Sequence, residues 1–185
     1  MPAAKRISKE AIIDAAAAVL RIGGFEAINA RSVAKALGCS TQPIYLSFRN
    51  MEELKSALTQ RAIEQHTQRV RESLRAHEGC DSRYSSYGMG FVQFAAQEKQ
   101  LFRWLYLEDN QPGRHQEDVL EPEIIRTVMD EFGYDEVTAR AFHRDMTYYS
   151  YGLAILANTG HLALTETELR EAFRREFRAL AAYYG

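Results

Sequence analysis

The sequence predicts an all-α protein with a small N-terminal head followed by a larger helical domain. Apolar residues recur at intervals of three and four along almost the whole chain, which is the helical period. No group of strand-length segments alternates strictly between apolar and polar residues. The chain has 185 residues, 46% of them hydrophobic, and can bury a core without disulfides or metal ions. We expect about nine helices and place the domain boundary between residues 50 and 51.

The first expected helix follows Ser8, whose hydroxyl can accept a hydrogen bond from a free backbone N–H of the first turn. Gly23 and Gly24 end this helix, because glycine readily adopts the left-handed conformation that follows a helix C-terminus. The apolar face comprises Ile12, Ala15, Ala16, Val19 and Leu20.

Two short helices come next, separated by residues 38–40. Asn29 is expected to cap the first, and Ser40 is expected to cap the second, with Pro43 in its first turn. Proline is tolerated there because the donor it lacks would have no partner inside the helix. The buried faces of the pair comprise Val33, Ala34, Leu37, Ile44 and Phe48.

Caps and helix breakers delimit the remaining helices. Asn50 with Glu53, and Thr165 with Glu168, have the spacing of a capping box. In order, we expect helices from 50 to about 75, from about 82 through an aromatic-rich stretch to a loop at 110–113, from 122 to 132, from 135 to 159 and from 165 onward.

The formal net charge of -2 hides an uneven distribution. Residues 1–60 contain eight basic and five acidic side chains, a net +3, so the remaining 125 residues carry a net -5. A basic head on an acidic body indicates a divided task. A protein that neutralises DNA phosphates needs its cations where it touches them, and only the head has this surplus.

Composition disfavours several classes of protein. No apolar stretch approaches the roughly 20 residues needed to cross a bilayer, and the N-terminus lacks the apolar segment of a secretory signal. With only Cys39 and Cys80 we expect a cytoplasmic protein with reduced thiols. Its histidines form no metal-ligand pattern, and no nucleophile–base grouping stands out, so we expect no metal, no cofactor and no enzyme activity.

The two short helices between residues 29 and 48 have the pattern of a helix-turn-helix, whose second helix enters the major groove of DNA. On spacing alone, a corner of a helical bundle is also consistent with them. Polar side chains on the outer face can reach bases or phosphates, since glutamine pairs with adenine and the threonine methyl group contacts that of thymine. The expected contact residues are Arg31, Ser40, Thr41, Gln42 and Ser47.

About fifty residues then follow a known order of motifs. An alanine-rich helix is followed by Gly24-Phe25, Val33-Ala34, Leu37-Gly38-Cys39-Ser40, Ile44-Tyr45, Phe48, Asn50 and Leu54. The stretch 7–58 therefore resembles the DNA-binding head of the TetR family of transcriptional regulators. This resemblance favours the helix-turn-helix interpretation over the bundle corner.

The resemblance implies a homodimer that binds palindromic double-stranded DNA through its third helix. It adds Pro43 and Tyr45 to the contact positions, and Tyr45 matches the family tyrosine that usually touches a phosphate. One position departs from the family pattern: Met51 stands where a phosphate-binding lysine is usual. We expect Arg49 or Lys55 to compensate for it.

Beyond about residue 60 the resemblance weakens. The family fold implies a ligand cavity among helices five to eight, and aromatic and methionine side chains suit an apolar pocket, although the same stripes can simply form the core. The expected lining residues are Tyr87, Met89, Phe91, Phe94, Trp104, Met129, Met146 and Tyr149.

The family fold also implies that the last two helices form the dimer interface. We expect this interface around Gly152, because a smooth helix surface lets another helix approach closely, together with Leu169, Phe173 and Phe177. The alternative is that these residues belong to the core of a monomer.

We therefore expect a ligand-responsive DNA-binding transcriptional regulator, in the form of a repressor that a small molecule releases from its operator. Two alternatives belong to other classes: an α-helical small-molecule-binding protein without DNA function, and an α-helical enzyme. A steep loss of DNA affinity with salt distinguishes the regulator from both.

Overall fold

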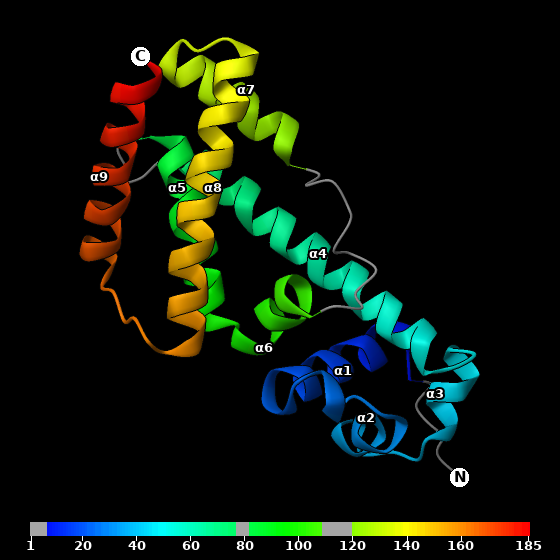
Figure 1. The fold of residues 1–185 in the computed structure, drawn as a ribbon. Helices are drawn as coiled ribbons and strands as arrows, with labels where there is room; N and C mark the ends of the chain where they lie inside the picture. The colour runs from blue at the N-terminus through cyan, green and yellow to red at the C-terminus, as the bar shows by residue number, and fades with distance from the viewer. Residues whose placement is uncertain (1–6, 77–81, 109–119) are drawn as a thin grey trace. The chain divides into compact units, whose positions relative to one another are not determined.

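The computed structural model of the chain describes residues 7–76, 82–108 and 120–185 (Figure 1). Within these residues it contains nine α-helices, one 3-10 turn, one π-helical turn and no β-strand. The all-α prediction is confirmed. None of the described helices is long and apolar enough to span a membrane.

The chain divides into two compact units. Residues 1–64 and 100–115 make the first unit, and residues 65–99 and 116–185 make the second. The long helix α4 (Met51–Ala76) contributes to both units. The domain boundary expected between residues 50 and 51 stays a prediction.

The first unit packs three short helices against the start of α4. These are α1 (Lys9–Gly23), α2 (Ala30–Leu37) and α3 (Gln42–Ser47), with the 3-10 turn η1 (Phe25–Ala27) after α1. The unit also contains most of α6 (Lys99–Phe102) and the π-helical turn Arg103–Leu107. The side chains that are at most 1% exposed are Ile12, Leu20, Val33, Ile44, Leu54, Leu58, Phe102 and Trp104.

Most of the expected caps of the first unit are confirmed. The Ser8 hydroxyl accepts from the Ala11 N–H at 3.1 Å, and the Asn29 side chain accepts from the N–H groups of Arg31 and Ser32. Gly38 ends α2 in the left-handed conformation, with φ of 67°. The geometry of these caps fixes where the two helices of the helix-turn-helix begin and end.

The cap expected at Ser40 is wrong by one residue. Thr41 precedes α3, and its side chain makes no capping hydrogen bond. An N-cap oxygen normally accepts from the second or third N–H of the helix. Pro43 removes the second of these, and the third, from Ile44, is taken by the Thr41 carbonyl at 3.1 Å.

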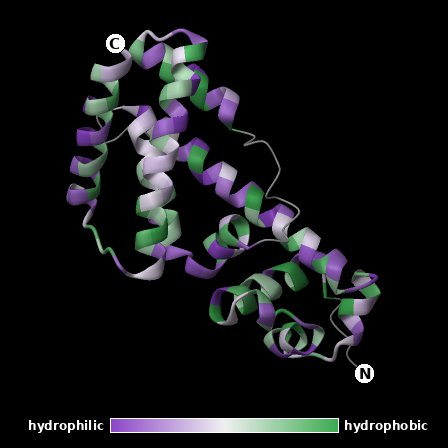
Figure 2. Ribbon diagram, viewed as in Figure 1, coloured by the Kyte–Doolittle hydropathy of each residue, from purple (hydrophilic) through white to green (hydrophobic). Residues whose placement is uncertain are grey.

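The second unit is built from α5 (Arg83–Gln97), α7 (Glu121–Phe132), α8 (Glu136–Thr159) and α9 (Glu166–Tyr184), together with the second half of α4. α5, α8 and α9 pack against one another, and α7 packs on α8 and α5. Hydrophobic and hydrophilic residues mix along each helix, as an amphipathic arrangement requires (Figure 2). The buried side chains lie between the helices and include Phe91, Ile124, Val128, Phe142, Met146 and Phe173.

Two close contacts hold α5 in place in the second unit. Gly88 lies under Phe173 of α9, where an added Cβ would come within 2.5 Å of the ring atom Cε1. Asn158 of α8 is 1% exposed and donates from Nδ2 to the carbonyls of Ala95 and Lys99. These carbonyls lie at the C-terminal end of α5, where a helix lacks internal partners.

Candidate nucleic-acid interface and ligand cavities

The helix-turn-helix places one face of α3 on the surface of the first unit. Ile44 and Phe48 are 1% and 3% exposed, because they pack against α1 and its neighbours in the core. Tyr45 and Leu46 point away from that core and are 54% and 79% exposed. A six-residue helix with its inner side buried and its outer side bare has the form of a recognition element.

The nine residues predicted to contact DNA are all at least partly accessible. Arg31, Ser40, Gln42, Tyr45 and Arg49 are exposed, and Thr41, Pro43, Ser47 and Lys55 are half-buried. They all come from the same short stretch of α2, the turn, α3 and the start of α4. Their contacts with DNA stay a prediction.

The structure separates the two residues expected to compensate for Met51. The Arg49 side chain is 89% exposed, although its Nε donates to Glu53 at 3.1 Å. Lys55 is engaged more fully, since its Nζ lies 4.4 Å from the centroid of the Phe25 ring and 3.5 Å from a Glu52 carboxylate oxygen. Arg49 is therefore the better placed of the two to meet a phosphate.

Glu53 organises the start of α4 beside this surface. Its carboxylate accepts from the Arg49 backbone N–H at 2.8 Å, and the Lys9 ammonium lies at 3.9 Å. The hydrogen bond from the Arg49 backbone is the main cause that lowers the pKa of Glu53. The expected capping box is half formed: Asn50 Oδ1 accepts from the Glu53 N–H at 2.9 Å, whereas the Glu53 side chain turns to Arg49.

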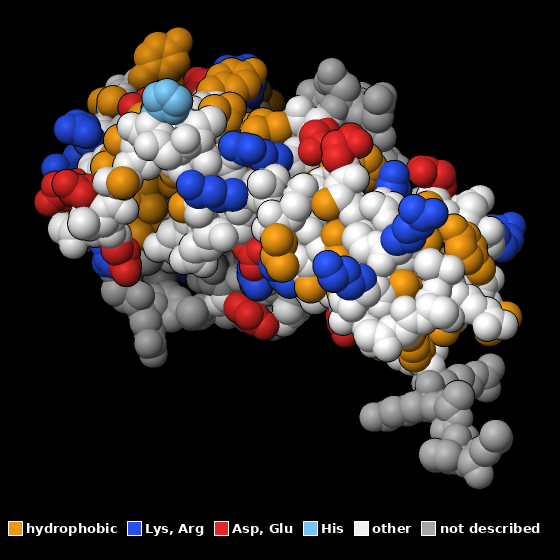
Figure 3. Space-filling view, turned by 90° about the horizontal axis from the view of Figure 1, so that it is seen from below, with side chains coloured by type: hydrophobic (Ala, Val, Ile, Leu, Met, Phe, Trp, Pro, Cys, Tyr) orange, Lys and Arg blue, Asp and Glu red, His pale blue; other side chains and the backbone are white. Residues whose placement is uncertain are grey.

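Charge on the surface is mixed. Lys and Arg side chains lie at separate points of the face shown in Figure 3, with acidic side chains between them. The modest surplus of +3 in residues 1–60 is thus not gathered into one dense patch. Any DNA contact by the head depends on individually placed residues together with steep local geometry, and less on a broad field.

Leu46 is a surface residue that the sequence interpretation missed. An exposed leucine between Tyr45 and Ser47 has no packing role in the first unit. The available signal was its place one residue after Tyr45, on the face opposite Ile44 and Phe48. An apolar side chain at such a place can contact a thymine methyl group.

Two cavities are described in the second unit. The first, of about 330 Å³, lies between α4 and α5, and the second, of about 350 Å³, lies among α5, α7, α8 and α9. Both volumes fall at the lower end of the range for small-molecule sites. We call them the α4–α5 cavity and the α9 cavity.

The residues expected to line one pocket are spread over several places. Tyr87 and Phe94 line the α4–α5 cavity, with His66 and Gln93, and Met146 lines the α9 cavity. The other expected lining residues lie elsewhere: Met89 and Phe91 are buried, Met129 and Tyr149 are half-buried, and Trp104 belongs to the first unit, where its ring centroid is 5.7 Å from that of Phe25.

The residues expected at the dimer interface are only partly accessible. Leu169 and Phe173 are 4% and 2% exposed and pack inside their own unit, so this part of the expectation is wrong. Side chains at helical spacing on α8 are exposed instead: Tyr148, Ile155 and Leu156 are 68%, 39% and 44% exposed. Gly152 lies between them, and an added Cβ there would meet nothing within 4 Å.

Comparison with known proteins decides the nature of the head. Residues 12–58 match the model of the family described as "Bacterial regulatory proteins, tetR family". The head of this chain belongs to the TetR family. A TetR-family head makes the protein a DNA-binding transcriptional regulator. No curated protein sequence matches the chain.

Solved structures share the fold over nearly the whole chain. A protein of unknown function from Rhodococcus sp. RHA1 is 17% identical, with a TM-score of 0.74 over 99% of this chain and 98% of that one. The fatty acid degradation regulator FadR from Bacillus halodurans is 16% identical, with a TM-score of 0.60 over 94% of each chain. The TetR-family head and the helical C-terminal domain therefore occur together in one fold.

No group of three or more His, Cys, Asp or Glu side chains that could hold a metal ion occurs among the described residues. Cys39 is a half-buried free thiol, and Cys80 lies outside the part of the chain that the structure describes.

Proposed function

We propose that this TetR-family protein is a ligand-responsive repressor that binds a palindromic DNA operator as a homodimer. The observation that carries the proposal is the bare outer face of α3 in a head that matches the family over residues 12–58. In the proposed complex, α3 enters the major groove, and two such helices in a dimer bind half-sites about one turn of DNA apart, roughly 34 to 36 Å.

Each surface side chain has a proposed role that follows from its chemistry. Gln42 reads an adenine by two hydrogen bonds, and the methyl groups of Thr41 and Leu46 contact thymine methyls. Tyr45, 54% exposed, and Arg31 donate to backbone phosphates, which fixes the register of the helix on the duplex. Arg49 supplies the phosphate contact that Met51 cannot make.

The exposed apolar stripe on α8 is the proposed dimer interface. Tyr148, Gly152, Ile155 and Leu156 lie on one side of α8, and Val137, 78% exposed, continues the same side. Large apolar side chains rarely remain exposed together on a soluble protein unless a partner covers them. A second copy of the chain would cover the stripe and hold two heads at a fixed separation.

Ligand response requires a site in the second unit. The two cavities there supply the proposed space for a small molecule. A ligand releases the repressor only to the extent that it binds the DNA-free state more tightly than the DNA-bound state. An α-helical small-molecule-binding protein without DNA function is the alternative, and it shares the cavities but not the need for a bare α3.

Selection from a random duplex library tests the proposal. The full-length protein is expected to enrich an inverted repeat whose half-site centres are about 10 base pairs apart or a multiple of that. The variant Gln42→Ala, which removes the proposed adenine contact, is expected to relax the preference at one base position of each half-site. Enrichment of no sequence by the wild-type protein contradicts the proposed operator binding and favours the alternative.

A further inference from the structure

The α9 cavity combines an aromatic floor with a basic rim. Its floor is formed by Tyr84 of α5, Phe132 of α7, Met146 of α8, and Phe173 and Phe177 of α9. The ring centroids of Phe132 and Phe177 are 4.7 Å apart, so the floor is held by direct ring contacts. Such a floor suits the apolar body of a ligand.

The rim is polar and carries positive charge only. Arg174 and Arg178 line the cavity from successive turns of α9, and the hydroxyl groups of Ser82 and Ser85 lie at the start of α5. Residues four apart on a helix lie on the same side, so both guanidinium groups can approach the same ligand atom. No aspartate or glutamate is among the residues that line this cavity.

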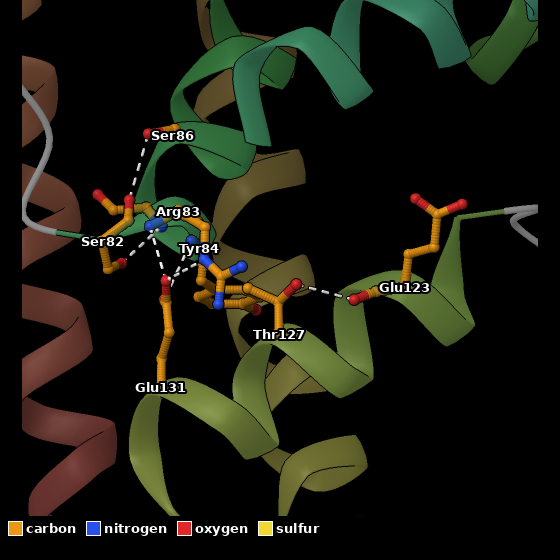
Figure 4. Close-up of polar contacts among 8 residues, drawn as sticks. Ser82, Arg83, Tyr84, Ser86, Glu123, Thr127 and Glu131 are labelled. Atoms are coloured by element: carbon orange, nitrogen blue, oxygen red, sulfur yellow. Dashed lines mark hydrogen bonds and ion pairs between the residues drawn. The ribbon is translucent and has the colours of Figure 1, made fainter. Parts of the chain in front are cut away.

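The nearest acidic group, Glu131, is already neutralised. Figure 4 shows its carboxylate turned toward the start of α5. One oxygen accepts from the Arg83 backbone N–H and from Arg83 Nε, both at 3.0 Å, and the other accepts from the Tyr84 N–H at 3.3 Å. The side chain of Ser82 accepts from the Ser85 N–H at 2.9 Å.

These bonds have two consequences for the site. The first N–H groups of α5 are used within the chain, so the helix start is not the anion-binding element. The charge of Glu131 is compensated by Arg83 and does not cancel that of the two rim arginines. A positive field therefore faces a ligand in the α9 cavity, and it comes from α9.

We propose that the α9 cavity binds a small carboxylic acid with an apolar body. The guanidinium groups of Arg174 and Arg178 hold the carboxylate, because their planar arrays of donors match its two oxygens. The hydrocarbon or aromatic body lies on Phe132, Met146 and Phe177. The cavity volume of about 350 Å³ limits the ligand to a small molecule.

This inference rests on the proposed ligand response for its biological role, but binding itself can be measured without DNA. The probes are octanoate and 2-naphthoate, compared with the uncharged 1-octanol, in calorimetric titrations of the full-length protein. Both carboxylates are expected to bind, and octanoate is expected to bind about tenfold or more tightly than 1-octanol because it alone can pair with the arginines.

Two variants and a control locate the site. The double variant Arg174→Gln/Arg178→Gln is expected to lose about tenfold or more in affinity for octanoate and to keep its affinity for 1-octanol. Ser85→Ile, which fills the rim without changing charge, is expected to weaken both carboxylates. Arg126→Gln, an exposed arginine of α7 that does not line the cavity, is the matched control and is expected to bind like the wild type.

Three results would overturn the inference. These are equal affinities for octanoate and 1-octanol, unchanged octanoate affinity in the double variant, and no binding of either carboxylate by a folded wild-type protein. If any of them occurs while the protein still selects an operator, the α9 cavity is not the carboxylate site and the proposed regulator stands. If the carboxylates bind as expected and no operator is selected, the reverse holds.

Discussion

The side-chain amide of Asn158 donates to the carbonyl of Ala95 at 2.9 Å, across 63 residues of sequence. A second hydrogen bond from the same nitrogen reaches the Lys99 carbonyl at 3.0 Å. The residue is 1% exposed, so one buried polar side chain closes the C-terminal end of α5. The end of α5 and the middle of the second unit are thereby tied together.

Replacing Asn158 by Leu is expected to lower the free energy of unfolding by about 2 kcal/mol or more, because two carbonyls lose their donor where water cannot replace it. Urea denaturation followed by circular dichroism measures the change. Gln60→Ala, on the exposed side of α4, is the control and is expected to stay within about 0.5 kcal/mol of the wild type. Equal stabilities of the Asn158→Leu variant and the control would show that these bonds contribute nothing.

Gly88 and Gly152 are expected to respond in opposite directions to the same substitution. Gly88→Ala places a Cβ 2.5 Å from Phe173 and is expected to destabilise the fold by about 1 to 3 kcal/mol through overpacking. Gly152→Ala meets no atom within 4 Å in the chain and is expected to stabilise the isolated helix by up to about 1 kcal/mol. Thermal unfolding of the two variants at low protein concentration makes the comparison.

The reason for the Gly88 effect can be checked by a second substitution. Phe173→Leu removes the ring that the added methyl group meets, so the double variant is expected to lose less than the sum of the two single losses. Strict additivity would mean that Gly88 is required for another reason.

Charge on the α8 stripe is expected to separate the homodimer. Tyr148→Glu with Leu156→Glu introduces two desolvated carboxylates in each half of the proposed interface, which is unfavourable when apolar surfaces meet. Sedimentation velocity is expected to show a monomer. Ile22→Glu, an 87% exposed site on α1, is the control and is expected to leave a dimer. A dimer that persists in the α8 variant places the interface elsewhere.

Glu53 is expected to stabilise the head at neutral pH and not in acid. Its pKa is lowered in the folded chain, chiefly by the hydrogen bond from the Arg49 backbone N–H. The stabilisation is therefore present above the ordinary glutamate pKa, about 4.3, and disappears as pH falls through the lowered value. Glu53→Gln is expected to be less stable than the wild type at pH 7, with the difference shrinking below about pH 4.

Urea midpoints at pH 7, 5 and 4 follow this difference. Glu52→Gln, whose side chain is 80% exposed, serves as the control. A difference between Glu53→Gln and the wild type that is the same at all pH values would mean that the carboxylate charge has no part in the stability of the head.

The sequence predicted the helical elements well because each has a local signal. Ser8, Asn29, Asp135 and Thr165 all accept the hydrogen bonds that their places before a helix predict. The cap at Ser40 failed because the two residues before Pro43 compete for the cap, and the missing proline N–H leaves no side-chain bond to identify the right one. Local rules locate helices well and choose less well between adjacent caps.

Packing of distant segments could not be predicted in the same way. The apolar stripe of α9 indicates that Phe173 and Phe177 are buried, but not whether their own chain or a second copy covers them. The structure buries Phe173 against Gly88, and this contact joins residues far apart in sequence. The α9 cavity likewise depends on four helices, so no single stretch of sequence predicts it.

The central claim, DNA binding by the outer face of α3, is tested most directly by fluorescence anisotropy titrations of the selected duplex at several salt concentrations. We expect wild-type affinity to fall steeply as salt rises, because bound phosphates release counterions. Arg31→Ala with Tyr45→Phe is expected to weaken binding and to reduce the salt slope by about 1, while the protein stays a dimer. Affinity that is independent of salt, or full affinity in this double variant, would contradict the account.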